Sequence, residues 1–350
     1  AGGPPARAVA PAGQGASSAE EWPEEGDPDF SEDDYSWYSN SRTKRHNKLK
    51  SFSDANFPTD PDGRVYHLQF RRGDVANRII SVGDVGRAEF LASMLEPALD
   101  GRVHKVVSSR GFVTHTGRYG GQPVSVIATL MGVSNMDMVV REARAVVDGE
   151  MVIVRVGTCG GLQPAAPVGT IVIASKGAAS CYRNPDAFAD DADSSEELFR
   201  FSKPIPADDA LSTALAANMR KHVGETTSVV EGMNVTACSF YSSQGRSDAA
   251  FDDRNDDLTD VLVEHYPEAM SLEMETFHLL DMCRASRGSI RGSAAALVLA
   301  ARFSNEFIDS SQVAEVMEKA GRAAFETVAA IDLDVPHGKE AYGDDCAWHA

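Results

Sequence analysis

Arg155 lies inside an apolar run, MVIVRVG at 151–157, that otherwise has the composition of a buried strand. The run continues directly into Thr158 and the glycine pair at 160–161. A permanent cation in such a strand is costly to bury unless an anion or a hydrogen-bond acceptor compensates it. A guanidinium fork, a hydroxyl group and main-chain N–H groups at one strand end can together bind an anion. The spacing of these residues therefore points to an anionic ligand.

Three further strand ends carry polar or glycine-rich residues: VGD at 82–84, LMGVSN at 130–135 and AARFSNE at 300–306. In α/β sheets, ligands bind beyond the carboxyl ends of the strands. Each segment alone is more often only a tight turn, and the absence of GxGxxG argues against a dinucleotide site. The combination favours an anion site, and its members are Gly83, Arg87, Arg110, Arg155 and Thr158.

Segments of strand and helix character alternate from about residue 64 to residue 335. Strands are expected at 78–84, 123–132, 151–157, 170–175, 228–240 and 294–304. Helices are expected at 88–96, 136–147, 211–223, 271–288 and 310–331. Asn135 or Asp137 is expected to cap the second of these helices. Because the strands are apolar on both faces, the sequence predicts an α/β fold, a single domain with three α/β/α layers and a central mixed, largely parallel sheet.

Composition divides the chain into three parts. Residues 1–63 are rich in Pro, Gly, Ala, Ser and acidic residues, and are predicted to be a disordered, low-complexity acidic extension. Residues 64–335 are predicted to form the folded domain, and residues 336–350 a C-terminal tail. The basic run at 42–50 is interpreted as a solvated linker, with organelle targeting as the alternative. Because the sequence starts with Ala1, it is expected to be a fragment or a processed product.

The 350 residues carry a formal net charge of −19. Excess negative charge argues against nucleic acid as a partner, and the sequence has no apolar run long enough for a membrane span. The five cysteines have no CxxC spacing, and their odd number argues against a disulfide framework. A reducing compartment, the cytoplasm, is therefore expected.

Five motifs follow one another along the chain: VGDVGR (82–87), SSRGF (108–112), RVGTCGG (155–161), FYSSQGR (240–246) and LEMET (272–276). Their order resembles the nucleoside phosphorylase superfamily with a hexamer-type subunit, and most closely its uridine phosphorylases. The resemblance covers Tyr66 to Ile331 and implies phosphorolysis, in which phosphate attacks C1′ of a nucleoside and the base leaves. It implies uridine and inorganic phosphate as substrates, and neither a metal ion nor an organic cofactor.

The resemblance assigns the anion-site residues to phosphate. In it, Gly83, Arg87, Arg155 and Thr158 hold the phosphate, and a neighbouring subunit lends Arg110 across a dimer interface. A planar guanidinium fork suits this role because it meets phosphate oxygens bidentately. A homo-oligomer, at least a dimer with shared active sites, is therefore expected.

The resemblance also implies a ribose site built around LEMET. Glu275 accepts the ribose hydroxyl protons, Met274 packs against the sugar, and Glu273 is the less certain of the two acids. His67 of the neighbouring subunit is expected to reach the 5′-hydroxyl group. A lone histidine is more often structural, and an isolated E-M-E is more often a solvated carboxylate beside a core methionine.

The base site implied by the resemblance comprises Phe240, Gln244, Arg246 and Arg302. Phe240 stacks on the base, Gln244 reads the uracil edge, and Arg246 stabilises charge that develops on the carbonyl oxygens. Arg87, Arg155 and Arg246 are therefore the expected catalytic residues. Purine-specific relatives carry an aspartate where Ala301 stands, so purine nucleosides are expected to be poor substrates.

Several alternatives stay open at the level of sequence. A broader pyrimidine nucleoside phosphorylase that accepts deoxyuridine or thymidine, a purine nucleoside phosphorylase, and a catalytically inactive nucleoside-binding homologue are the competing functions. Gly111 stands where some relatives have a glutamate that helps to hold a monovalent cation. The segment TLMGVSN (129–135) departs from the family signature in its glycine content.

Overall fold

The computed structural model describes residues 52–97, 101–189, 195–335 and 346–348. The chain divides into two compact units, and the second, residues 50–350, contains every residue described below. The predicted disordered extension lies mostly outside the described residues, as does most of the predicted tail, and both stay predictions. Residues 52–63 form an irregular segment that leads into the domain.

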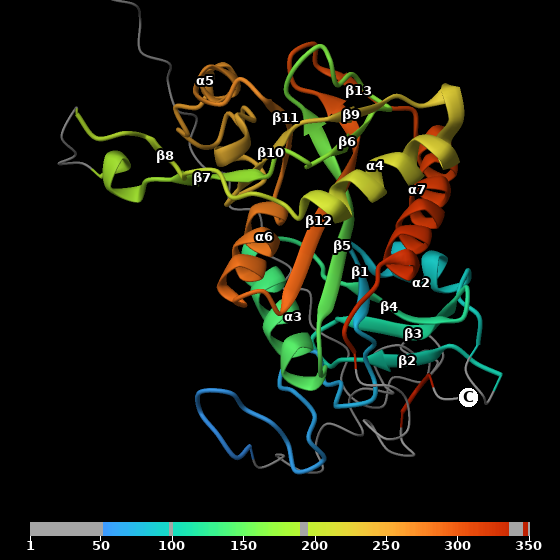
Figure 1. Ribbon diagram of the computed structural model, residues 1–350. Helices are drawn as coiled ribbons and strands as arrows, with labels where there is room; N and C mark the ends of the chain where they lie inside the picture. Colours follow the sequence, from blue (N-terminus) through green and yellow to red (C-terminus); the bar gives the residue numbers. More distant parts are fainter. Residues whose placement is uncertain (1–51, 98–100, 190–194, 336–345, 349–350) are drawn as a thin grey trace, which may run out of the picture. The chain divides into compact units, whose positions relative to one another are not determined.

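The described part of the chain alternates strands with helices through most of its length (Figure 1). The strands are β1 (Arg78–Val82), β2 (His104–Val107), β3 (Val113–Tyr119), β4 (Gln122–Ala128), β5 (Met151–Gly161), β6 (Ile171–Ile173), β7 (Ala178–Arg183), β8 (Phe199–Phe201), β9 (Val229–Glu231), β10 (Met233–Ala237), β11 (Ala269–Glu273), β12 (Ile290–Ala301) and β13 (Glu306–Phe307). The helices are α2 (Val85–Ala92), α3 (Val133–Val146), α4 (Asp209–Val223), α5 (Leu258–His265), α6 (Thr276–Ala285) and α7 (Ser310–Ala330), with short 3-10 turns η2 (Pro185–Phe188), η3 (Gly224–Thr226) and η4 (Ser242–Gln244).

One mixed sheet joins these strands, and β5 lies at its centre. β1 and β12 flank β5 in parallel register, whereas β11 pairs antiparallel with its glycine-rich end. The order β2-β3-β4-β1-β5-β11-β10-β7-β8 runs along the sheet, and β12 connects β5 to β6 and β13. The predicted α/β class and mixed central sheet are confirmed. Because β1, β5 and β12 are parallel, their carboxyl ends meet on one side of the molecule.

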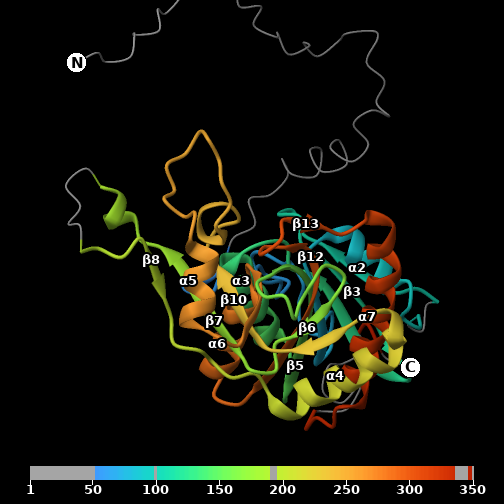
Figure 2. The same cartoon turned by 90° about the horizontal axis from the view of Figure 1, so that it is seen from above.

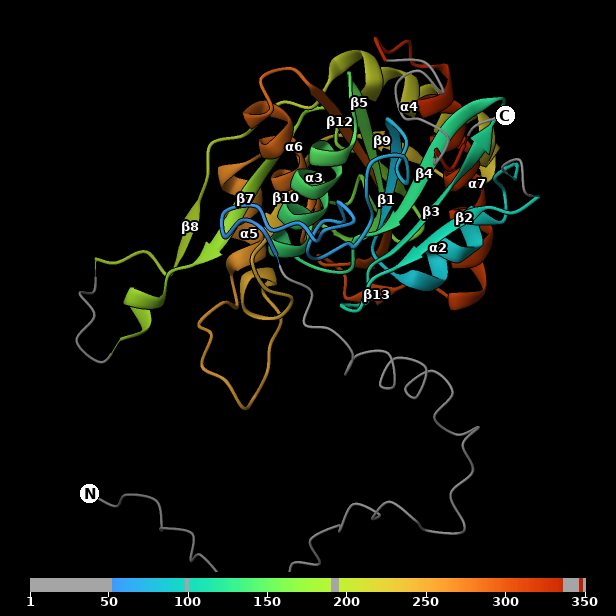
Figure 3. The ribbon, with the colours of Figure 1, turned by 90° about the horizontal axis from the view of Figure 1, so that it is seen from below.

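Helices cover both faces of the sheet, and strand residues alternate between them. Ile80 and Val154 belong to the apolar cluster beneath α2, α4 and α7, whereas Ile79 and Ile153 belong to the cluster beneath α3 and α6. Figures 1, 2 and 3 show α4 beside α7 on one side of the central strands, and α3 near α6 on the other. Each such aliphatic side chain contributes about 1.5–3 kcal/mol by burial. None of the helices in these ranges combines the length and apolar character that a bilayer crossing requires.

Two segments predicted to be single elements are each divided, so those predictions were wrong in detail. The strand expected at 228–240 is β9 and β10 separated at Gly232, where a Cβ atom would collide with the side chain of Met270. The helix expected at 271–288 begins only at Thr276, because Ala269–Glu273 pairs with β10 as β11.

The predicted cap of α3 was also wrong. The helix begins at Val133, and Gly132 occupies the N-cap position with a φ of 92°. The Asn135 side chain instead donates to the main-chain oxygen of Met131. A positive φ favours glycine because it has no Cβ, so the loop before α3 depends on Gly132.

Candidate active site

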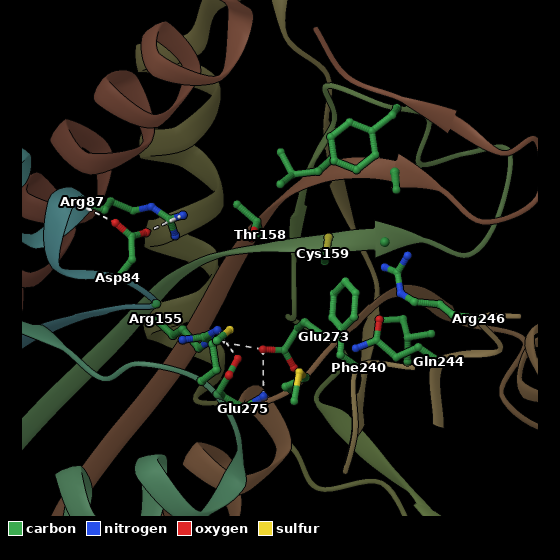
Figure 4. A pocket seen from close by; sticks show the side chains of 18 residues that line it. Asp84, Arg87, Arg155, Thr158, Cys159, Phe240, Gln244, Arg246, Glu273 and Glu275 are labelled. Atoms are coloured by element: carbon green, nitrogen blue, oxygen red, sulfur yellow. Dashed lines mark hydrogen bonds and ion pairs between the residues drawn. The ribbon is translucent and has the colours of Figure 1, made fainter. Parts of the chain in front are cut away.

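A cavity of about 270 Å³ opens where β1, β5, β11 and β12 end. It brings together ten of the residues that the sequence pointed to, whereas His67, Arg110 and Arg302 lie outside its lining. Figure 4 shows Arg87 and Arg246 at opposite ends, with Thr158 and Cys159 between them. The lining comprises Gly83, Asp84, Arg87, Met131, Arg155, Thr158, Cys159, Gly160, Phe240, Gln244, Arg246, Leu272, Glu273, Met274, Glu275, Leu299, Ala300 and Phe307.

Arg87 lies on the first turn of α2 and is oriented by Asp84. The two side chains pair at 3.0 Å, and the Asp84 carboxylate also accepts the main-chain N–H of Arg87 as the N-cap of the helix. Burial lowers the pKa of Arg87, Asp84 opposes this, and the nearby charge of Arg155 lowers it further. Two guanidinium groups facing one cavity next to a helix N-terminus favour an anion.

Arg155 is 4% exposed and lies between two buried carboxylates. Its Nε donates to Glu273 at 3.1 Å, and its Nη2 donates to Glu275. Burial by itself lowers the pKa of Arg155, but the two carboxylates outweigh burial and raise it. Its Nη1 is buried without a hydrogen-bond partner in the described part of the chain. A buried cationic donor without an acceptor is rare in native proteins, so this nitrogen is suited to a ligand oxygen.

Gly157 makes room for the Arg155 guanidinium. A Cβ atom at this position would lie 3.2 Å from Nη2 of Arg155, so any side chain would press against the charged group. Thr158 follows directly and lies half-buried in the lining of the cavity. The absence of a side chain at Gly157 therefore leaves the space that the Arg155 guanidinium occupies.

Glu275 is the buried carboxylate that connects Arg155 with the loop before α3. It accepts the main-chain N–H of Gly132 through Oε1 and Arg155 through Oε2. Burial raises the pKa of Glu275 to about 7, although Arg155 opposes the shift, and Glu273 adds to it. Met274 lies beside Glu275 in the cavity wall.

Glu273 lines the cavity, but its oxygens serve the protein itself. They accept Nε of Arg155, the hydroxyl of Thr236 at 2.8 Å, and the main-chain N–H groups of Glu275 and Thr276. This carboxylate therefore ends β11, starts α6 and orients Arg155. These are positioning tasks, and the ribose contact that the resemblance implied for Glu273 stays a prediction.

The opposite end of the cavity is formed by the loop 240–246. The Arg246 guanidinium stacks over the Phe240 ring at 4.0 Å, and Gln244 is 2% exposed. Burial, followed by the charge of Arg302, lowers the pKa of Arg246. Arg302 donates from behind the loop to the main-chain oxygens of Gln244 and Gly245. Arg302 thus holds the loop in place and does not line the cavity.

Sequence reasoning missed Asn255, which also fixes this loop. Its amide donates to the main-chain oxygen of Ser242 at 2.8 Å and more weakly to those of Tyr241 and Arg246. Asn255 is 4% exposed although it lies in an acidic segment that otherwise looks like a surface loop. No periodicity or motif marks it, because its role depends on a contact across the fold.

The carboxylates that line the cavity are all paired with arginines. Asp84 pairs with Arg87, and Glu273 and Glu275 pair with Arg155. The wall near Arg246 is completed by uncharged residues, namely Cys159, Leu299, Ala300 and Phe307. Burial raises the pKa of Cys159 well above its ordinary value, so this thiol stays protonated.

His67 and Arg110 lie together, but neither lines the cavity of its own chain. The Arg110 guanidinium lies 4.7 Å from the ring centroid of Tyr66, the residue that precedes His67. The His67 ring is hydrogen-bonded to Glu142 on α3 at 2.6 Å. Tyr66 and His67 are adjacent in the chain, so one short segment contacts Arg110 and holds His67 against α3.

The mixed sheet and a strand-end cavity that joins guanidinium groups to a buried carboxylate and an aromatic side chain agree with the nucleoside phosphorylase resemblance. The chain belongs to the phosphorylase superfamily, whose family model matches residues 77–331. The resemblance inferred from the five motifs is thereby confirmed.

Proteins similar to this chain include uridine phosphorylases and purine nucleoside phosphorylases. A uridine phosphorylase from Thermococcus kodakarensis is 28% identical over 266 residues, which cover 74% of this chain and 85% of that protein. A DeoD-type purine nucleoside phosphorylase from Streptococcus uberis is 32% identical over 179 residues, 51% of this chain and 67% of that protein. A solved structure from work on two diverse uridine phosphorylases of Phytophthora capsici is 44% identical, with a TM-score of 0.77 over 81% of this chain and 100% of that chain.

Proposed function

We propose that this protein catalyses the phosphorolysis of uridine to uracil and ribose 1-phosphate. One observation carries the proposal: a single cavity joins Arg87 and Arg155 to Phe240, Gln244 and Arg246, and every carboxylate among the described residues that line it is paired with an arginine. The uridine phosphorylases among its relatives support the same substrate.

Phosphate occupies the end of the cavity between the two arginines. Arg87 and Arg155 donate to its oxygens, and the buried Nη1 of Arg155 thereby gains the acceptor that it lacks in the described residues. The Thr158 hydroxyl and the Gly83 N–H complete the set. Charge-assisted bonds of this kind are about twice as strong as neutral ones, and they fix the attacking oxygen beside C1′.

Ribose lies between phosphate and base. The Glu275 carboxylate accepts the ribose hydroxyl protons, and Met274 packs against the sugar. As the C1′–N1 bond breaks, positive charge develops on the ribose, and the phosphate and Glu275 stabilise it. A phosphate oxygen then forms the new bond to C1′.

The electron pair of the broken bond moves into the uracil ring. Gln244 both donates to and accepts from the uracil edge, and Arg246 stabilises the negative charge on the carbonyl oxygens. A proton from solvent then neutralises the base. Guanidinium groups supply the positive charge in this scheme, so it requires no metal ion and no organic cofactor.

The active unit in this proposal is a homodimer. His67 and Arg110 lie outside the cavity of their own chain, and in the shared-site arrangement they complete the cavity of the partner. The odd number of cysteines and the absence of CxxC spacing support a reducing compartment, the cytoplasm, as the location.

Uridine with and without phosphate tests the proposal. Uracil release followed by chromatography should depend on phosphate, and ³¹P NMR should show ribose 1-phosphate as the second product. Uracil release at the same rate without phosphate would indicate hydrolysis and would contradict the proposal. Inosine tests the purine alternative that the DeoD-type relative represents.

A further inference from the structure

Glu142 is an ionisable residue on a helix face that is otherwise apolar. The remaining buried residues of α3 are Met136, Val139, Val140, Ala143 and Val146. Glu142 itself is 6% exposed. Burying an ionised carboxylate is costly unless hydrogen bonds compensate it, so its presence among aliphatic residues requires a reason.

Within the described ranges, the donors that reach this carboxylate come from two adjacent residues, His67 and Leu68. The main-chain N–H of His67 lies 3.0 and 3.1 Å from the two carboxylate oxygens, and the main-chain N–H of Leu68 lies 2.8 Å from Oε2. The His67 ring adds a fourth bond, with Nδ1 at 2.6 Å from Oε1. The main-chain bonds would suffice to brace the turn, whereas the fourth bond fixes the side chain as well.

The turn that carries His67 is itself rigid. The Val65 N–H donates to the oxygen of Phe70, and the Gln69 N–H donates to the oxygen of Val65. Val65, Leu68 and Phe70 are buried, whereas the His67 side chain is 30% exposed. The segment is therefore anchored on both sides of a histidine that faces outward.

The bond to Glu142 also selects the tautomer of His67. An ionised carboxylate can only accept hydrogen bonds. In the bond between Nδ1 and Glu142, Nδ1 of the ring must therefore carry the hydrogen. In the neutral ring, Nε2 is then a hydrogen-bond acceptor on the far side of the ring. Nε2 has no partner among the described residues, and an acceptor in this position suits a hydroxyl group.

We propose that Glu142 is a positioning residue for phosphorolysis, which acts through His67 on the 5′-hydroxyl of the nucleoside in the neighbouring subunit. The inference rests on the proposed function, in which His67 completes the partner's cavity. Glu142 holds the ring angle and the tautomer with one carboxylate. Its loss should therefore affect only substrates that carry the 5′-hydroxyl.

Uridine and 5′-deoxyuridine distinguish this role from a purely structural one. Glu142→Gln should lower kcat/KM for uridine by roughly tenfold, the effect of one misaligned hydrogen bond to a bound hydroxyl. The same variant should leave kcat/KM for 5′-deoxyuridine within about twofold of the unmodified protein. His67→Ala should likewise lower kcat/KM for uridine and not for 5′-deoxyuridine, because it removes the group through which Glu142 acts.

Glu326→Gln is the matched control. Glu326 accepts Nε2 of His222 at 2.6 Å, a histidine–carboxylate pair like the first, but neither residue lines the cavity. This variant should leave both substrates unchanged. If Glu142→Gln is too unstable to assay, Glu142→Asp can replace it, because the shorter side chain keeps the charge but moves the oxygens away from the His67 ring. Glu142→Asp should also lower kcat/KM for uridine and not for 5′-deoxyuridine.

The double variant Glu142→Gln with His67→Ala completes the test. Its kcat/KM for uridine should equal that of His67→Ala alone, since Glu142 has nothing left to position. Equal losses for both substrates in the Glu142 variants, or losses that multiply in the double variant, would overturn the inference. Absence of phosphate-dependent turnover in the unmodified protein would overturn the proposed function itself, and is a distinct result.

Discussion

At the scale of single residues, two arginines at the same end of the cavity have different surroundings. Arg155 is enclosed by two buried carboxylates, whereas Arg87 pairs with Asp84, whose side chain is 54% exposed. Replacing Arg87 leaves its partner in water. Replacing Arg155 leaves two carboxylates buried and unpaired, so the consequences for stability differ.

Arg87→Ala should therefore impair phosphate use with little loss of stability. The expected cost is on the order of 2–4 kcal/mol of transition-state stabilisation, or roughly 30- to 1000-fold in rate. Steady-state kinetics with phosphate as the varied substrate and a thermal melt on the same sample measure both quantities. Normal phosphate kinetics in this variant would place the anion elsewhere.

Arg155→Ala should lose activity and stability together. Breaking a buried ion pair by removing one partner costs about 3–5 kcal/mol, because Glu273 and Glu275 lose their common counterion. The two buried carboxylates therefore make the fold sensitive to this change. A melting temperature equal to that of Arg87→Ala would contradict the described pairing.

Glu275 gives uridine binding a pH dependence. The pKa of Glu275 is raised to about 7, so ionising this carboxyl in the folded protein costs free energy. The free energy of unfolding therefore falls as the pH rises towards 7. In the proposed function, ribose recognition needs the ionised form of Glu275. The Kd of uridine, measured without phosphate to avoid phosphate's own titration, should therefore increase roughly tenfold for each pH unit below the pKa. Glu275→Gln should remove this dependence, and its persistence in the variant would assign it to another group.

At the scale of elements, the sequence predicted the types of most long segments but not where short ones divide. The parallel strands β1, β5 and β12 and the helices α4 and α7 have periodic, well-buried patterns, and each was predicted near its observed position. LEMET was assigned to one helix because its apolar spacing suits a helix. The break after β11 depends on Glu273 bonds to Thr236 and to the α6 N-terminus, which are contacts between distant segments.

An Asn255 variant tests whether the loop 240–246 needs the hydrogen bonds of Asn255 to keep its position. Asn255→Ala removes the amide that holds the oxygens of residues 241, 242 and 246, so kcat/KM for uridine should fall by roughly tenfold, the effect of a hydrogen-bonded brace worth about 1–2 kcal/mol. Asn218→Ala is the control, because Asn218 bonds Thr327 between α4 and α7, away from the cavity. Equal effects of the two changes would show that the brace acts through global stability alone.

At the scale of the whole molecule, sequence motifs located most of the cavity but not its supports. Arg155 was predicted from its position in an apolar strand and from its motif, whereas Gln244 was predicted from its motif alone. Glu142, Asn255 and the bracing role of Arg302 act through other residues from distant segments. Their functions depend on which strand ends and turns lie together, and only the fold provides that information.

The shared site predicts that activity follows assembly. Because His67 and Arg110 lie outside their own cavity, a monomer should turn over uridine poorly. Light scattering and activity measured on the same dilution series should change together. Full activity in a fraction that scatters as a monomer would contradict the shared arrangement.

The most direct test of the central claim is a comparison of uridine and inosine at saturating phosphate. In the proposed function, Gln244 and Arg246 bind a pyrimidine edge, whereas this chain has Ala301 where the resemblance places an aspartate for N7 of a purine. A site built to hydrogen-bond one base edge leaves buried groups unpaired with another. We predict a kcat/KM for uridine that exceeds that for inosine by about 100-fold or more. Comparable values would contradict the assignment to uridine.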